Sequence, residues 1–336
     1  MKKGWRVKIS ACMFCCILLL TACKSQNIRH EAISNPSEGY TVTDIQGTVI
    51  QMPGRPQHIV ALSASLDETL LGLVEIQRMA AVDEGMDDPA ASNVTELVKQ
   101  VPARVKRAPS AETIAALQPD LVIAPDWGNL EVVSALRDLG IPVVVCKGPQ
   151  TLQDIKDNIR LLSVAVGEPQ RGEVLQQKMQ AKLDEIEQKV ARIPVEQRKS
   201  AVWLSTMRSY GGSGSSFDEA CQFAGVRNGM AEAGVKNGQT MSKEMLLAVN
   251  PDFLFLPGDT KKSKGKAAEL RDEYLQDPSL QVITAIRKEN LREPRSGYLL
   301  NCSQDFVFGV QEIAYMVYGD AFAQAADCHL TAVDEE

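Results

Sequence analysis

The stretch Ser110-Ala-Glu-Thr-Ile-Ala-Ala-Leu-Gln-Pro-Asp-Leu-Val-Ile-Ala-Pro125 returns 132 residues later as Ser242-Lys-Glu-Met-Leu-Leu-Ala-Val-Asn-Pro-Asp-Phe-Leu-Phe-Leu-Pro257. Each copy begins with a serine suited to cap a helix and carries a glutamate two residues later. Each ends in a Pro-Asp turn followed by an apolar strand. The separation is the size of a domain, far longer than the about 20 to 50 residues of a solenoid repeat. The pair therefore predicts two similar α/β lobes that face each other across a cleft.

The N-terminus predicts a bacterial lipoprotein signal over residues 1–22. Four basic residues precede an apolar run from Ile9 to Leu20, and a Thr-Ala pair leads to Cys23. The run is shorter than the roughly 20 residues of a membrane span, and small residues directly before a cysteine favour cleavage there. We expect Cys23 to carry lipid, and the polar residues 23–40 to form a flexible tether. An ordinary secretory signal with an incidental cysteine is the alternative.

The charge of the chain excludes some partners. The formal charge is −7, and removal of residues 1–22 takes away four basic and no acidic residues. Such an acidic surface disfavours nucleic acid and anionic headgroups. No later apolar stretch reaches spanning length, so we expect a soluble, monomeric body held at a membrane surface by its lipid. The roughly 300 remaining residues suit two lobes of ordinary size.

The cysteines do not indicate a metal site. Outside the signal and Cys23, the chain has Cys146, Cys221, Cys302 and Cys328, and none of them forms a C-x-x-C pair. A structural zinc site is therefore not expected. Cys146 lies in an apolar strand and is interpreted as a small buried hydrophobe. The sequence leaves open whether Cys302 and Cys328 form a disulfide.

Strands alternate with helices in the first predicted lobe, residues 41–149. We expect strands at 58–63, 79–82, 121–124 and 141–146, and helices at 66–73 and 130–139. Such alternation predicts a parallel sheet with helices on its faces. The second predicted lobe, residues 195–336, begins with a strand at 201–205. It continues through a glycine-rich loop, a helix at 217–224, the repeated element and a helix at 305–318.

Residues 150–194 between the lobes are predicted to be helical. After Glu168-Pro169 an apolar stripe recurs at helical spacing, at Leu175, Met179, Leu183 and Ile186. A helix of about 23 residues spans roughly 35 Å, enough to cross from one lobe to the other. A coiled-coil dimer is the alternative interpretation, although the stripe is short for one.

The candidate site follows from the rule that ligands bind beyond the carboxyl ends of parallel strands. The loops selected by this rule carry hydroxyls, aromatic rings and an arginine: Ser63, Ser65, Asp126, Trp127, Arg208 and Tyr210. A flat, partly apolar ligand with polar edges would suit them. The alternative is that Trp127 and Tyr210 are loop residues packed under a neighbouring helix. The Gly211–Ser216 run lacks the Gly-Lys-Ser/Thr ending of a phosphate loop.

The histidines argue against an enzyme. His30 lies in the tether, His58 begins a strand, and His329 is near the C-terminus. None follows a strand, so neither a Ser-His-Asp arrangement nor a histidine-rich metal site is expected. The same absence argues against a receptor for bare zinc or manganese.

An ordered set of features resembles a known family. It comprises the lipobox, the tether, a Thr43-Asp44-x-x-Gly47 hairpin, Arg55-Pro-Gln-His-Ile-Val-Ala-Leu-Ser63, Gln118-Pro-Asp-Leu-Val-Ile-Ala124, the long helix and Asn250-Pro-Asp252. Together they resemble the substrate-binding lipoproteins of ABC importers for iron–siderophores, haem and cobalamin, over essentially all of residues 41–320. The resemblance implies the class III periplasmic-binding-protein architecture, in which one long helix joins two Rossmann-like lobes and permits only small hinge motion.

The resemblance also implies partners and roles. It implies delivery of a metal chelate to an ABC permease dimer with its ATPase subunits, no intrinsic cofactor, and an extracytoplasmic place. The loop after Ala124 looks like the cobalamin-binding branch, whereas siderophore binders show more basic residues, of which Arg208 and Arg295 are candidates here. Arg295 and Tyr298 join the expected ligand-binding set. Glu131 and Glu244 match the glutamates that dock on the permease, although both also suit simple helix capping.

Two readings from other classes are kept as alternatives. One is an extracytoplasmic enzyme or redox protein built on a two-lobe α/β scaffold, which lacks a nucleophile–base pair and a cofactor fingerprint here. The other is a structural or adhesive lipoprotein.

Overall fold

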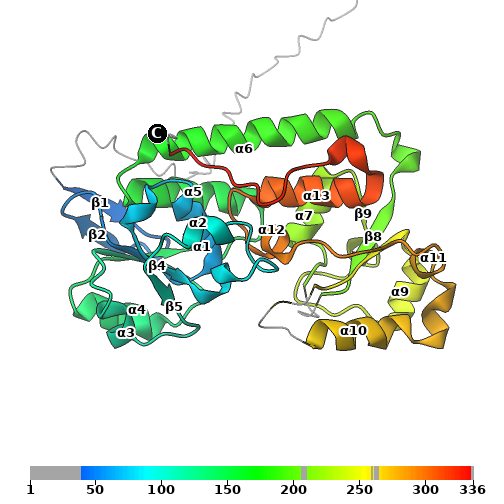
Figure 1. The fold of residues 1–336 in the computed structure, drawn as a ribbon, viewed down its shortest axis with the longest axis horizontal. Coiled ribbons are helices and arrows are strands. Elements are labelled where there is room, and N and C mark those ends of the chain that lie inside the picture. Colours follow the sequence, from blue (N-terminus) through cyan, green and yellow to red (C-terminus); the bar gives the residue numbers. More distant parts are fainter. Residues whose placement is uncertain (1–38, 206–209, 259, 261–264, 334–336) are drawn as a thin grey trace, which may run out of the picture. The chain divides into compact units, whose positions relative to one another are not determined.

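The computed structural model describes residues 39–205, 210–258, 260 and 265–333, and contains two parallel sheets flanked by helices (Figure 1). The first sheet has the order β5-β4-β3-β6-β7 and only parallel pairs. Its strands are β3 (Ile59–Ala61), β4 (Met79–Asp83), β5 (Ala103–Val105), β6 (Leu121–Pro125) and β7 (Val143–Cys146). They are short and apolar because helices cover both faces of the sheet. Sequence reasoning missed β5.

The second sheet repeats the central order of the first. Its strands are β8 (Ser200–Trp203), β9 (Arg227–Asn228), β10 (Phe253–Phe255) and β11 (Leu291–Arg292), in the order β11-β10-β8-β9. All three pairs are parallel. The strands β8 and β10 therefore occupy the places that β3 and β6 hold in the first sheet. The predicted fold class, two α/β lobes with parallel sheets, is confirmed.

The two copies of the repeat have matching structures. The helices α3 (Ala111–Ala115) and α9 (Lys243–Val249) are capped by Ser110 and Ser242, whose side chains accept the third backbone N–H of the helix. In each copy the residue before the Pro-Asp pair is left-handed, with φ of 52° at Gln118 and 47° at Asn250. This turn reverses the chain from the helix into the strand.

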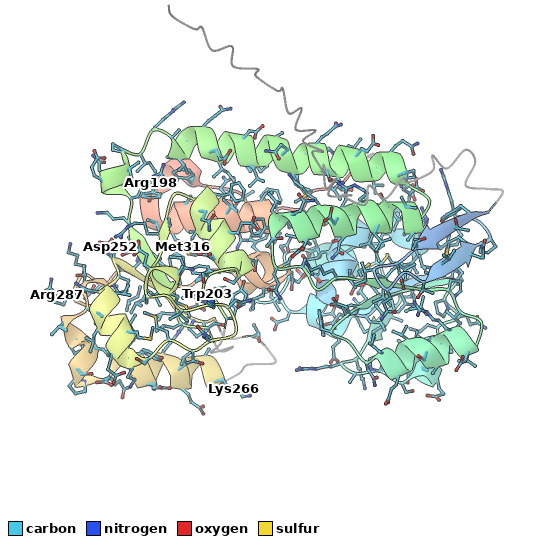
Figure 2. The ribbon with its side chains drawn as sticks, turned by 180° about the vertical axis from the view of Figure 1, so that it is seen from behind. Arg198, Trp203, Asp252, Lys266, Arg287 and Met316 are labelled. Carbon is cyan, nitrogen blue, oxygen red and sulfur yellow. The ribbon has the colours of Figure 1, made fainter. Side chains whose placement is uncertain are left out.

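The repeated aspartate then joins two strands. The carboxylate of Asp120 accepts the backbone N–H groups of Gln57 and His58, just before β3. That of Asp252, labelled in Figure 2, accepts the N–H and the hydroxyl of Ser200 at the start of β8. In both lobes the aspartate therefore connects the strand of the repeat to its parallel neighbour: β6 to β3 in the first lobe, and β10 to β8 in the second.

A hairpin precedes the first sheet. Its strands β1 (Tyr40–Thr43) and β2 (Val49–Met52) are antiparallel, with Tyr40 opposite Met52. Asp44 accepts the N–H groups of Gln46 and Thr48, and Gly47 has a φ of 79°, which a glycine adopts without strain. The hairpin expected at Thr43–Gly47 is thus present.

Helices surround both sheets. Besides α3 and α9, they are α1 (Ala64–Leu71), α2 (Thr95–Val98), α4 (Leu130–Asp138), α5 (Leu152–Ala165), α6 (Pro169–Val190), α7 (Ser216–Phe223), α8 (Gly229–Glu232), α10 (Lys266–Leu275), α11 (Thr284–Arg287), α12 (Ser296–Leu300) and α13 (Phe306–Tyr318). Short 3₁₀ turns are η2 (Ile76–Arg78), η3 (Glu84–Asp87), η4 (Val195–Gln197), η5 (Pro278–Val282) and η6 (Asp320–Phe322).

The helix α6 follows β7 and α5 and leads toward β8. Its 22 residues begin with Pro169, which has no N–H to leave unpaired at the first position. At 1.5 Å per residue the helix is about 33 Å long. Leu175, Met179, Leu183 and Ile186 are fully buried, and α6 packs on α5, α7 and α13. Its apolar stripe is therefore used inside this chain, which argues against the coiled-coil alternative.

One hydrophobic core runs through both lobes. It includes the inner face of the first sheet, the stripes of α5 and α6, and Trp203, Phe217 and Phe255 under the second sheet. The Trp203 ring, labelled within the second lobe in Figure 2, lies 5.3 Å from the rings of both Tyr210 and Phe217. Two smaller cores cover the opposite face of each sheet. The lobes thus share a packed layer rather than one connecting helix alone.

The C-terminal segment returns to the first lobe. After η6 the chain runs back along α6 (Figure 1, red), and the N–H of Ala332 donates to the carbonyl oxygen of Gly72, 2.8 Å away. The hydroxyl of Tyr298 donates to the Cys328 carbonyl and accepts the Cys328 N–H. The expected picture of one helical connection is therefore incomplete, because residues 325–333 form a second one.

Candidate functional site

A cavity of about 460 Å³ opens beyond the carboxyl ends of the strands of the first sheet. The loops after β3, β5 and β6 contribute to it, together with Asp83 at the end of β4 and with residues 300–301 at the end of α12. The chain leaves β3 toward β4 and β5 and later returns to form β6 and β7, so the loops after β3 and β6 diverge at this point. This is the position at which open parallel sheets bind ligands.

The loop after β3 brings the positive end of α1 to the cavity. Ser63 is the N-cap, but its side chain does not cap the helix, and its hydroxyl lies 3.3 Å from that of Ser65. Ser63 and Ser65 both line the cavity, as predicted. The first N–H groups of a helix lack internal partners and carry a partial positive charge. This corner therefore offers two hydroxyls and free N–H groups to an anion.

The loop after β6 presents an aromatic ring. Trp127 lines the cavity and is 68% exposed, which argues against packing under a helix. A side chain at Gly148 would approach the Trp127 ring to 2.5 Å, so only glycine leaves it room. Asp126 accepts the N–H of Gly148 and thereby holds the loop. Asp126 was expected to bind ligand, but it lies outside the cavity lining.

The loop after β5 adds two basic residues that the sequence analysis missed. Lys106 and Arg107 line the cavity and are exposed. Within the described part of the chain, neither forms an ion pair. The nearby Arg104, by contrast, forms an ion pair with Asp87, with 2.9 Å between its Nη2 and the Oδ1 of Asp87. The signal was weak because β5 has only three residues, and Arg104 interrupts its apolar pattern.

The candidates from the second lobe lie elsewhere. Arg208 is outside the described residues. The hydroxyl of Tyr210 is 2.5 Å from that of Ser216 and donates to the Leu299 carbonyl, and its ring packs edge-on against Trp203. Burial raises the pKa of Tyr210. Tyr210 therefore takes the packing role that was its alternative, and it does not line the cavity.

Arg295 and Tyr298 also lie away from the cavity. The backbone N–H and the guanidinium of Arg295 donate to the Glu312 carboxylate, and the guanidinium lies 4.5 Å from the centre of the Tyr298 ring. Tyr298 is 1% exposed, and burial raises its pKa. Their partners are in α13 and the C-terminal segment, so in this structure they stabilise that segment instead of facing a ligand.

The two predicted docking glutamates are exposed in first helical turns. The Asn129 side chain accepts the backbone N–H of Glu131 in α4, and Ser242 caps the helix that contains Glu244. Hydrogen bonds from its own backbone N–H and from the Ser242 hydroxyl lower the pKa of Glu244. Glu112 holds the same position in α3, and the Ser110 hydroxyl lowers its pKa. The three sites are chemically alike, so local geometry alone does not separate docking from capping.

The described residues contain no cluster of three or more metal-ligating side chains. Of the histidines, His58 is exposed at the start of β3, His329 pairs with Asp305 at 2.7 Å, and His30 lies outside the described residues. Cys302 and Cys328 are free thiols in this structure, as are Cys146 and Cys221.

A second cavity of about 340 Å³ adjoins the first. The two share Ala64, Asp83 and Asn301, and Thr260 of the second lobe also lines the second cavity.

Across the described ranges, no helix is long and apolar enough to cross a bilayer. Two parallel-sheet lobes with a ligand-sized cavity at the strand ends define a two-lobed binding protein of the class III periplasmic architecture.

Comparison with known proteins identifies the family. A periplasmic binding protein model matches residues 59–296, and the chain belongs to that family. The Fe(3+) dicitrate-binding periplasmic protein FecB of Escherichia coli is 27% identical over 75% of this chain and 80% of its own length. The probable siderophore-binding lipoprotein YfiY of Bacillus subtilis is 28% identical over 46% of this chain, and the chain spans only 47% of that relative.

A solved structure shows the same fold. The periplasmic heme-binding protein RhuT from Roseiflexus, in its apo form, has a TM-score of 0.66 and 25% identity. The match covers 78% of this chain and 98% of that one.

Proposed function

We propose that this protein is the extracytoplasmic substrate-binding component of an ABC importer and that it captures an anionic metal chelate. The observation that carries the proposal is the composition of the larger cavity. An exposed tryptophan, two unpaired basic side chains and the N-terminus of α1 all converge on it. This set suits a ligand that is flat and apolar on one side and negatively charged on another.

The charge of the cavity favours a ferric carboxylate or siderophore. Lys106 and Arg107 supply positive charge that no described carboxylate neutralises, on a chain that is acidic overall. FecB binds ferric dicitrate and RhuT binds haem, by their names, and both are anionic chelates. Cobalamin, which the Trp127 loop suggested, stays in the ligand set as a test compound.

Equilibrium titration tests the ligand directly. Iron(III) citrate, iron(III) enterobactin, haem and cyanocobalamin would each be titrated into the purified protein by calorimetry. We expect at least one anionic chelate to bind tightly and to be recovered unchanged. Failure of all four to bind would contradict the proposal, and chemical turnover would favour the enzyme alternative.

A pair of charge variants sharpens the test. Arg107→Gln should weaken binding of an anionic chelate by about 3- to 10-fold, as expected for the loss of one charged contact near a protein surface. Lys99→Gln is the matched control, because Lys99 is an exposed cation that pairs with Glu96 and lies outside the cavity. Equal effects of the two variants would mean that only net charge matters.

The proposal includes an anchor and a division of the chain. Residues 1–22 would be the signal, Cys23 the lipidated residue, and residues 23–40 the tether; all but the last two of these 40 residues lie outside the described residues. Residues 41–149 and 195–336 would be the lobes, with 150–194 between them, in a monomer held to the envelope. Replacing Cys23 with serine should release the protein from the membrane fraction.

The proposed partner is a permease dimer with its ATPase subunits. Two exposed acidic side chains support it, Glu131 and Glu244, one on each lobe. The family consists of binding proteins, which agrees with a receptor without catalysis.

A further inference from the structure

Asn301 is a polar residue of the cavity that comes from the far end of the chain. It lies between α12 and α13, is half-buried, and lines both adjoining cavities. The other residues of the larger cavity, apart from its neighbour Leu300, come from positions 62–133. The C-terminal part of the chain therefore contributes a side chain to a site built mainly by the first lobe.

The orientation of the Asn301 amide follows from its partners. Its Nδ2 donates to Oε1 of Glu68 at 2.7 Å and to the carbonyl oxygen of Ala91 at 3.1 Å. Both partners are acceptors, so both amide protons are used and the side chain has one favourable orientation. No described residue donates a hydrogen bond to its Oδ1. This oxygen is also absent from the buried polar atoms that lack a partner, so it keeps some exposed surface. It is therefore an acceptor open to the cavity.

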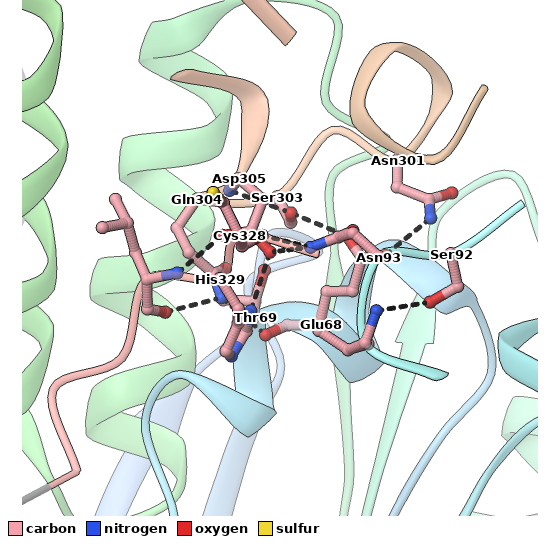
Figure 3. Close-up of polar contacts among 12 residues, drawn as sticks. Glu68, Thr69, Ser92, Asn93, Asn301, Ser303, Gln304, Asp305, Cys328 and His329 are labelled. Carbon is pink, nitrogen blue, oxygen red and sulfur yellow. Dashed lines mark hydrogen bonds and ion pairs between the residues drawn. The ribbon is translucent and has the colours of Figure 1, made fainter. Parts of the chain in front are cut away.

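The residue that fixes this amide is itself held rigidly (Figure 3). Glu68 has no exposed surface, and its Oε2 accepts the Ser303 hydroxyl at 2.8 Å. The Ser303 oxygen in turn accepts the backbone N–H of Asp305, whose carboxylate is bound by Asn93 and His329. A buried carboxylate is costly unless fully hydrogen-bonded, so this network constrains Asn301 strongly.

We infer that Asn301 is a ligand-contacting residue whose carbonyl oxygen accepts a hydrogen bond from a hydroxyl, metal-bound water or N–H group of the chelate. Glu68 is its positioning residue, one hydrogen bond away from the ligand. The inference rests on the proposed function. It adds an acceptor to a site otherwise rich in positive charge and donors, and so it favours chelates that carry a donor beside their negative charge.

The test uses the chelates titrated above and four variants of the full chain. Asn301→Ala should weaken every chelate that the wild type binds by about 3- to 10-fold, the usual effect of one lost hydrogen bond. Asn237→Ala is the matched control. Asn237 is a half-buried asparagine of the second lobe that lies outside both cavities, so its loss should change affinity by less than about twofold.

Two variants of Glu68 separate positioning from general stability. In Glu68→Gln the new side chain can still accept from Asn301 and can donate to the Ser303 hydroxyl, so affinity should be retained. Glu68→Leu frees the amide and should weaken binding as Asn301→Ala does. Melting temperatures of all variants would be measured in parallel.

Three results would overturn the inference. The first is unchanged affinity in Asn301→Ala, and the second is an equal loss in Asn237→Ala; either leaves the proposed function standing. The third is that the wild type binds none of the chelates, which removes the proposed function and this inference with it.

Discussion

Trp127 combines wide exposure with a fixed support, which is unusual for a large aromatic ring. Two-thirds of the residue is open to solvent, yet it sits at the edge of the cavity beside the backbone of Gly148. A ring that contributes little to the core but is held in place is suited to stacking on a ligand.

Replacing Trp127 with alanine should therefore affect binding and not folding. Stacking and burial of such a ring contribute on the order of 1–3 kcal/mol, so affinity for the bound chelate should fall by roughly 5- to 150-fold. The melting temperature should barely change, because the exposed ring stabilises the fold little. Calorimetry and thermal unfolding would measure the two effects; a large loss of stability with unchanged affinity would indicate a packing role.

His329 gives the fold a specific dependence on pH. Burial lowers the pKa of its imidazole, but the Asp305 carboxylate at 2.7 Å and the backbone of Leu71 together raise it by more, so the net pKa lies above the ordinary value. The ion pair is thus fully formed below about pH 6.5 and is lost as the pH rises through the folded-state pKa. Burial also raises the pKa values of Glu68 and Asp67 nearby, which act in the same direction.

Comparison with His329→Gln isolates the histidine, since Glu68 and Asp67 are common to both proteins. The variant should lose about 1–2 kcal/mol of unfolding free energy at about pH 6, and less at about pH 9. Urea denaturation at the two pH values measures this difference. A loss that is equal at both, or larger at high pH, would contradict a charged His329.

At the scale of single residues, the sequence predicted some of the side chains that line the cavity. Ser63, Ser65 and Trp127 could be predicted because each follows a strand with a clear apolar pattern. Lys106 and Arg107 could not, because their strand is three residues long. Arg295 and Tyr298 lie away from the cavity for another reason: their partners in α13 and the C-terminal segment follow no local pattern.

At the scale of helices and strands, the repeated Pro-Asp turn connects a helix to the strand that follows it and also binds the neighbouring strand. Asp120 and Asp252 perform the same task in different lobes, each accepting hydrogen bonds at the start of the adjacent strand. A side-chain acceptor is useful at this position because the N–H groups at a strand end have no partner in the ladder.

Alanine at either position should lower the unfolding free energy by about 1 kcal/mol, since water can replace part of the lost bonding at these partly exposed sites. Asparagine, which keeps one acceptor, should cost less. The double variant should be additive because the two sites lie in different lobes and share no contact. Urea denaturation of the single and double variants measures this, and a neutral effect at both sites would mean that the turns do not fasten the strands.

The long helix α6 was predictable because its stripe recurs over several turns. The short strands β9 and β11, with two residues each, were not. Their pairing is decided by the sheet that receives them, and no periodicity can be read from two residues.

For the molecule as a whole, the exposed acidic residues on the two lobes bear on transport. If Glu131 and Glu244 dock on a permease, replacing both with alanine should abolish uptake of the chelate in cells while leaving its affinity in solution unchanged. Glu112→Ala is the internal control, because Glu112 has the same capped position as Glu244 but should not affect uptake. Radiolabelled iron uptake and calorimetry would give the two readouts, and normal uptake by the double variant would leave only capping.

The two-lobe plan could be predicted because the chain repeats itself, whereas the shared core and the returning C-terminal segment could not. The core joins elements far apart in the chain, such as α6 and α13, and the returning segment bonds to partners more than 200 residues away, such as Cys328 to Asn93 and Ala332 to Gly72. Contacts of this range leave no periodic trace in either partner.

The returning segment determines the order in which the molecule can be completed. During synthesis the N-terminal half emerges first, with α1 and the five strands of the first sheet. The carboxylate of Glu68 and the carbonyl oxygen of Gly72, however, find their partners among residues 301–332. Until those residues arrive, a buried carboxylate in α1 has no donors, and the first lobe lacks part of its cover. The first lobe is therefore synthesised first but completes its hydrogen bonds last. We expect shortened chains that stop before residue 301 to be recognised by chaperones and proteases and not to persist as a folded lobe.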